Sequence, residues 1–141
     1  MKIRTCRGVW AVGGLLVAAA IVGAGSVAAG AAPVTIAALQ GNTAVAAYGG
    51  VAAWSDYDTA EKSWNVLVRR DGQISTTSVP SAGKAIEVAV GPGPSGPQVL
   101  AYLSCAGKCH LVVSALNGSD PRAIPGTQGA SHPTVWGERV A

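Results

Sequence analysis

The cysteines carry the most specific chemistry in this sequence. Cys105 and Cys109 lie four positions apart, and His110 follows directly. Two cysteines this close form a disulfide in an oxidising compartment. Haem attachment needs two residues between the cysteines instead of three, and a structural zinc site needs four ligands. The spacing therefore favours a structural disulfide between Cys105 and Cys109, with a redox or ligand role as the alternative.

Carboxylates and histidines supply the other candidates for chemistry. Asp56, Asp58 and Glu61 cluster in an expected loop. This loop lacks the glycine at position six and the acid at position twelve of an EF-hand calcium loop, so a solvated loop is favoured. His132 has no second histidine nearby in the sequence, and neither a Gly-x-Ser-x-Gly elbow nor a glycine-rich phosphate loop before a helix is found. We predict no enzyme: no catalytic residue, no metal site and no cofactor.

Four large aromatic residues recur along the chain: Trp54, Trp64, Tyr102 and Trp136. They could form a platform for a ligand, since aromatic rings supply large, rigid contact area. Trp54 and Tyr102 take equivalent places in two similar segments, which favours packing between repeated units. The pair Arg69-Arg70 ends an expected strand and is interpreted as a surface pair, not as an anion site.

The N-terminal segment predicts export. Lys2, Arg4 and Arg7 precede an uncharged run over residues 9–27, which small residues follow. This is the pattern of a secretory signal peptide. We therefore expect a cleaved signal helix over residues 1–31, a linker over 32–42, and a secreted or extracytoplasmic protein. An uncleaved membrane anchor is the alternative, because the run approaches the length that spans a bilayer.

The net charge of the 141-residue chain is +3, and this excess lies in the first seven residues. The remaining residues hold seven basic and seven acidic side chains, which leaves no net charge. A neutral body without a basic stripe argues against nucleic acid as a partner. A membrane is expected as a partner only if the N-terminal segment is retained.

Beyond Pro33 the sequence predicts short β-strands separated by turns, and no long helix. Gly49-Gly50, Asp71-Gly72 and Asn117-Gly118 are hairpin signals, and the glycine- and proline-rich segment 91–97 is expected to lie outside the strand ladder. The expected strands cover residues 43–48, 51–57, 64–70, 73–79, 86–90, 99–104, 110–116, 122–124, 133–136 and 139–141.

These strands form repeated units. Residues 51–55 match residues 99–103 at an offset of 48, and Val140-Ala141 match Val99-Leu100 at an offset of 41. A period near 44 with four strands per unit is typical of β-propeller blades. A small β-sandwich is the alternative, because it also uses short strands at this spacing.

The segment Pro133–Ala141 resembles the blade signature of TolB-like, WD-repeat-like β-propellers, and residues 49–55 and 96–102 are looser versions of it. The resemblance is to secreted actinobacterial proteins of this type, in which a two-cysteine hairpin joins two strands of a blade. The Ser-Pro-Asp-Gly turn of the family is missing. The resemblance implies a non-enzymatic scaffold that binds other proteins or small ligands.

We therefore predict an all-β fold of about two and a half four-stranded antiparallel propeller blades over residues 43–141, with blades at 43–80, 85–125 and 131–141. Because propellers close with about four to eight blades, a partial chain of a longer protein is expected. Self-association into a ring and a stand-alone β-domain are alternatives. The predicted function is a non-catalytic, secreted binding scaffold for an unknown protein or small ligand. The alternatives are a piece of a propeller-type hydrolase or lyase and a membrane-tethered sensor domain.

Overall fold

The computed structural model describes residues 35, 37–39, 41 and 43–141. The predicted signal helix over residues 1–31 and part of the linker lie outside these residues. Over the described part of the chain the fold is all-β, without a helix, and every strand pair is antiparallel. The predicted fold class of four-stranded antiparallel sheets is thereby confirmed.

The first sheet is a meander in the order β1-β2-β3-β4. Its strands are β1 (Val45–Tyr48), β2 (Val51–Asp58), β3 (Ser63–Arg70) and β4 (Gln73–Thr76). The hairpins at Gly49-Gly50 and Asp71-Gly72 have positive φ at both turn residues, from 51° to 82°. Such turns match the right-handed twist of the strands they join, which is why these dipeptides predict hairpins.

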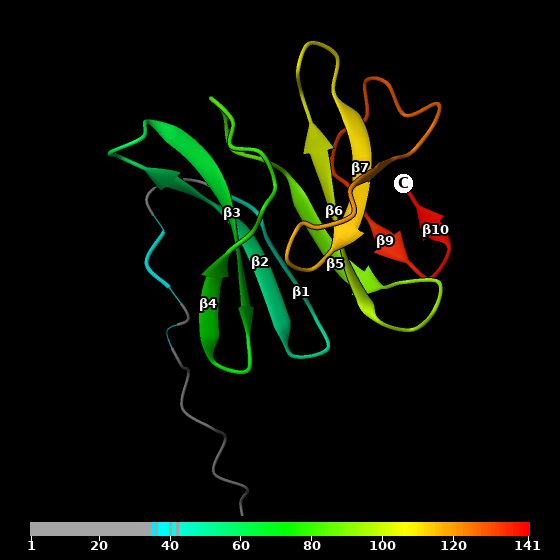
Figure 1. Cartoon of the computed structure of the whole chain (residues 1–141), viewed down its shortest axis with the longest axis horizontal. Helices are drawn as coiled ribbons and strands as arrows, with labels where there is room; N and C mark the ends of the chain where they lie inside the picture. Colours follow the sequence, from blue (N-terminus) through cyan, green and yellow to red (C-terminus); the bar gives the residue numbers. More distant parts are fainter. Residues whose placement is uncertain (1–34, 36, 40, 42) are drawn as a thin grey trace, which may run out of the picture. The chain divides into compact units, whose positions relative to one another are not determined.

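The second sheet repeats this topology in the order β5-β6-β7-β8, and a separate hairpin pairs β9 with β10 (Figure 1). Its strands are β5 (Val88–Pro92), β6 (Gln98–Ser104), β7 (His110–Ala115) and β8 (Arg122–Ala123). The hairpin strands are β9 (Val135–Trp136) and β10 (Arg139–Val140).

Two local predictions were wrong. Gly91 and Pro92 pair with β6 instead of lying outside the ladder. Proline is tolerated there because β5 is an edge strand, so one side of its backbone needs no partner. The strand predicted over residues 73–79 ends at Thr76, since Val79 leaves the sheet and enters the core. The hairpin predicted at Asn117-Gly118 is confirmed, since β7 and β8 are antiparallel and β8 begins at Arg122 as predicted.

The second sheet is buried on both faces. On one face it shares an apolar cluster with the first sheet, to which Val66, Val68, Leu100 and Tyr102 belong. On the other face a second cluster packs against the third hairpin. The members of the second cluster are Ala89, Ala101, Leu103, Leu111, Val113 and Val135. Successive residues of β6 therefore enter different clusters.

Equivalent residues of the two sheets also direct their side chains to the same side. Ala53 of β2 and Ala101 of β6, 48 positions apart, both face the next unit along the chain. In the third hairpin Val140 packs against the second sheet, whereas Val99 of β6 faces away from the first sheet. The predicted match of Val140 with Val99 is therefore wrong by one residue, and Leu100 is the structural counterpart.

The two apolar clusters predict two equally sensitive core positions. Leu100 and Leu111 are both fully buried, one in each cluster. We expect Leu100→Ala and Leu111→Ala each to lower the free energy of unfolding by about 2–5 kcal/mol, measured by denaturant titration. If the second face of β7 were solvated, Leu111→Ala would cost less than about 0.5 kcal/mol. That result would contradict the second core.

Tyr102 predicts a loss of stability at alkaline pH. Burial in the core raises the pKa of its phenol above the ordinary value. Above pH about 10 the unfolded chain loses this proton while the folded chain keeps it, so the free energy of unfolding falls as pH rises. We expect Tyr102→Phe to reduce this fall, measured by denaturant titration at neutral and alkaline pH. Tyr57→Phe, at a half-buried position outside both clusters, is the matched control.

Candidate functional site

A cleft of about 860 Å³ lies between the first and second sheets. It is placed at the end of the sheets where the β1–β2 and β3–β4 turns and the β5–β6 loop gather (Figure 1). The lining residues used in the argument are Tyr48, Gly49, Val68, Arg70, Ser75, Gln98, Leu116 and Asn117. This cavity is called the inter-sheet cleft below.

Polar bonds across the cleft fix the spacing of the sheets. The side-chain amide of Gln98 donates to the carbonyl oxygens of Tyr48 and Gly49, at 3.3 and 2.8 Å. The backbone N–H and the hydroxyl of Ser78 both donate to the Asn117 carbonyl, at 2.7 and 3.1 Å. The bonds join the β1–β2 turn to β6, and the segment after β4 to the β7–β8 turn. The cleft is therefore held open by the fold itself.

The β7–β8 turn lies so close to the segment after β4 that it requires a glycine at position 118. A Cβ atom on Gly118 would lie 2.7 Å from the Val79 amide nitrogen, and the residue has a φ of +84°. Both the contact and the backbone conformation exclude ordinary side chains. Gly118 thus lets the β7–β8 turn touch the segment that follows β4.

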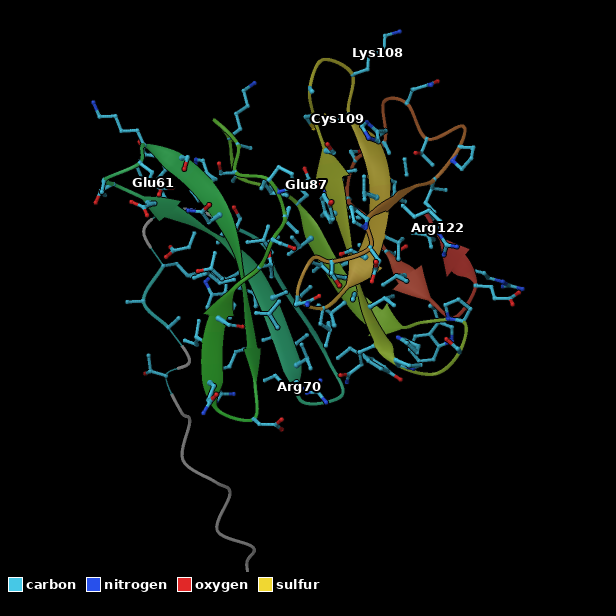
Figure 2. All side chains as sticks on the ribbon, viewed as in Figure 1. Glu61, Arg70, Glu87, Lys108, Cys109 and Arg122 are labelled. Carbon is cyan, nitrogen blue, oxygen red and sulfur yellow. A yellow bond between two sulfur atoms is a disulfide. The ribbon has the colours of Figure 1, made fainter. Side chains whose placement is uncertain are left out.

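The inter-sheet cleft combines apolar and hydrogen-bonding groups. Val68 and Leu116 contribute apolar surface, whereas Ser75 and Asn117 contribute polar side chains. Arg70 adds a guanidinium group, whose side chain is 66 % exposed and lies 3.5 Å from the Asp71 carboxylate. Figure 2 shows Arg70 at this end of the first sheet. Such a lining suits non-covalent binding, in which apolar groups supply contact and a few polar groups fix orientation.

A second hollow, of about 440 Å³, includes His132 and Glu87. The Glu87 carboxylate accepts the backbone N–H of His132 at 2.6 Å, and the imidazole Nδ1 lies 3.3 Å from the same oxygen. The imidazole is largely exposed, while the bonds join the segment before β9 to the segment before β5. The pair ties the third hairpin to the second sheet, which is a structural role.

The disulfide lies at the opposite end of the second sheet from the cleft. Cys105 and Cys109 are joined in the turn between β6 and β7, in agreement with the sequence prediction. Figure 2 shows Cys109 and Lys108 at the tip of this turn. His110 begins β7, where it pairs with Ser104. The disulfide therefore closes a hairpin turn.

The four predicted aromatic residues lie in different surroundings. Trp54 and Tyr102 are buried, with 2 % and 3 % of their surface exposed. Trp64 packs against Tyr57, with ring centroids 5.4 Å apart. Trp136 is 66 % exposed and meets Tyr48 edge-on at 5.5 Å. The structure does not bring the four together as one platform.

The predicted loop cluster of Asp56, Asp58 and Glu61 is wrong in part, because Asp56 and Asp58 lie in β2, opposite Asn65 and Ser63. Asp58 ends the strand and stabilises the β2–β3 turn. The Asp58 carboxylate accepts the backbone N–H groups of Ala60 and Glu61, at 2.8 and 3.0 Å. Such a bond from an aspartate to its own turn is a common stabiliser of tight loops. Within residues 43–141 and the few described before them, no group of three or more metal-ligating side chains is found.

The sequence interpretation missed the cleft residues. Arg70 is exposed, in agreement with the predicted surface pair, whereas Gln98, Ser75 and Asn117 are not among the predicted site residues. Arg70 and Gln98 lie at strand ends, Ser75 lies within β4, and Asn117 lies in the β7–β8 turn. Gln98 and Asn117 thus come from the second sheet and its turn, whereas Arg70 and Ser75 come from the first sheet. The usable signal was the repeat, because aligned turns of stacked sheets gather at one end.

Comparison of the chain with protein-family models, curated protein sequences and solved structures finds no match. In the part of the chain that the structure describes, no helix has the length and apolar character needed to cross a membrane.

The disulfide closes a loop of five residues and is expected to stabilise the folded chain measurably. In the chain-entropy model a loop of this size contributes about 2 kcal/mol. We expect the double variant Cys105→Ser, Cys109→Ser to lose about this free energy of unfolding, measured in denaturant without reductant. Ala106→Ser, in the same turn, is the matched control and should leave stability unchanged. A double variant as stable as the parent chain would contradict the prediction.

Proposed function

We propose that this chain is a secreted, non-catalytic scaffold of the β-propeller type, whose four-stranded sheets are consecutive blades. The inter-sheet cleft is its binding site for a partner protein or a small ligand. The TolB-like resemblance seen in the sequence remains a prediction. The single observation that supports the binding role most strongly is the cleft, whose width is set by hydrogen bonds from both sheets.

The burial of the second sheet on both faces supports the blade interpretation. In a two-layer sandwich each sheet packs on one face and is solvated on the other. Here apolar clusters lie on both faces of β6 and β7, so a third layer follows the second. Repeated units that share apolar faces with their neighbours are the physical basis of repeat proteins.

The disulfide supports a location outside the cytoplasm. Disulfides form and persist in oxidising compartments, and they are rare in the cytosol. Cys105 and Cys109 are joined in an exposed turn that any reductant would reach. Secretion agrees with the N-terminal pattern of charged, apolar and small residues.

The binding role is tested by filling the cleft. Ser75 lines the cleft, while its neighbour Ile74 is opposite Arg69 on the other face of β4. We expect Ser75→Trp to remove binding of peptides or small molecules selected on the parent chain from display and fragment libraries. Ile74→Trp, which places the same indole on the opposite face, should retain it. The measurement is a binding titration followed by amide NMR.

Selected ligands should shift the amide signals of Gln98 and Asn117, which line the cleft from the second sheet. Ligands that bind Ser75→Trp as well as the parent chain would contradict the proposal. A melting temperature for each variant shows that the sheets remain folded.

A further inference from the structure

All four residues of the edge strand β4 are exposed. Among the residues that the structure describes, it pairs with β3 on one side only and ends the first sheet (Figure 1). Its register places Thr76 opposite Leu67, Ser75 opposite Val68 and Ile74 opposite Arg69. The free side of such a strand is a row of backbone groups that another chain can pair with.

The hydrogen bond of Thr77, the residue after β4, shows which backbone groups of β4 point away from β3. The Thr77 amide donates to the Val66 carbonyl at 2.9 Å. Hydrogen-bonded pairs alternate along an antiparallel ladder, so Ser75 also directs its backbone groups at β3. Ile74 and Thr76 therefore direct their N–H and C=O groups away from the sheet.

Natural edge strands are protected by charges, prolines or shortness. The outer edge of the second sheet has all three protections: β8 is two residues long, Arg122 is charged, and Pro121 and Pro125 flank it. β4 is twice as long, and neither a charge nor a proline occurs from Gln73 to Ser78. The last strand of the second sheet, β8, is therefore protected against pairing, whereas the last strand of the first sheet, β4, is not.

The open edge adjoins the inter-sheet cleft. Ser75 lines the cleft, so a strand added beside β4 would direct alternate side chains towards the same side. Val68 and Leu116 offer apolar contact there, and Arg70, which lies 3.5 Å from the Asp71 carboxylate, offers guanidinium N–H groups. Arg69 lies on the other face, opposite Ile74. Apolar residues alternating with acidic ones complement these surroundings.

We propose that β4 binds an extended segment of a partner protein, built of alternating apolar and acidic residues, as a fifth strand of the first sheet. The side chains of that segment on the Ser75 side enter the inter-sheet cleft. This proposal rests on the binding function proposed above and names the class of partner. A second copy of β4 fits the edge less well. It would direct Gln73 and Ser75 into the cleft, and these polar side chains would leave Val68 and Leu116 without apolar contact.

The test uses the full chain and a short acetylated, amidated peptide of alternating valine and glutamate. We expect binding to protect the amide hydrogens of Ile74 and Thr76 from exchange, measured by NMR. Thr76→Pro removes an outward N–H without removing a bond to β3, and proline is tolerated at such edge positions. It should weaken binding by about tenfold or more.

Thr76→Val is the matched control, because it keeps the N–H and loses only the hydroxyl group; it should bind as the parent chain does. A peptide methylated on every backbone nitrogen should bind weakly, as should one with lysine in place of glutamate. Equal binding of the methylated peptide, or of Thr76→Pro, would overturn strand addition. A concentration-dependent dimer that Thr76→Pro abolishes would also overturn the proposal, since a second copy would then occupy the edge.

Failure here can be separated from failure of the proposed function. If Ser75→Trp removes peptide binding while Thr76→Pro retains it, the cleft binds ligands and the strand pairing is wrong. If neither substitution weakens binding, both proposals are wrong. Equal melting temperatures of Thr76→Pro and Thr76→Val show that any difference between them is not caused by unfolding.

Discussion

The rest of the structure depends on the burial of the second sheet on both faces. Along β6 the even positions Leu100 and Tyr102 face the first sheet, and Ala101 and Leu103 face the third hairpin. A strand buried on both faces needs apolar side chains at successive positions instead of alternate ones. This requirement explains the near-continuous apolar runs of β5, β6 and β7. It also makes each neighbouring unit part of the core of the next.

Apolar contacts alone would leave the spacing of the sheets loosely defined, because they are non-directional. The spacing of the sheets is fixed by a few hydrogen bonds. The buried hydroxyl of Ser55 accepts the Ile86 amide at 3.0 Å, between β2 and the segment before β5. Gln98 and Asn117 form the ties at the turn end. An unpaired polar group in such a position costs free energy, so these bonds select one arrangement of the two sheets.

The strands could be predicted from the sequence because their signals are local. Gly49-Gly50 and Asp71-Gly72 determine hairpins by their own backbone preferences, and alternation or continuity of apolar residues indicates which faces are buried. The cleft could not be predicted, because Arg70 and Gln98 come from different sheets and meet only after stacking. The one-residue error at Val140 has a similar cause: a two-residue strand contains too little pattern to fix which face is buried.

The same packing constraint determines where recognition can occur. Only 12 % of the residues are charged, and β5, β6 and β7 contain no Asp, Glu, Lys or Arg. The faces of these three strands are required for packing, so their charged neighbours lie in turns, at strand ends and at sheet edges. Arg70 at the end of β3 and Arg122 in β8 follow this rule. Because the polar groups that could orient a partner are excluded from these buried faces, the binding proposed above is assigned to the turn ends and to the exposed edge of β4. Those are the places where the chain can change without loss of its shared cores.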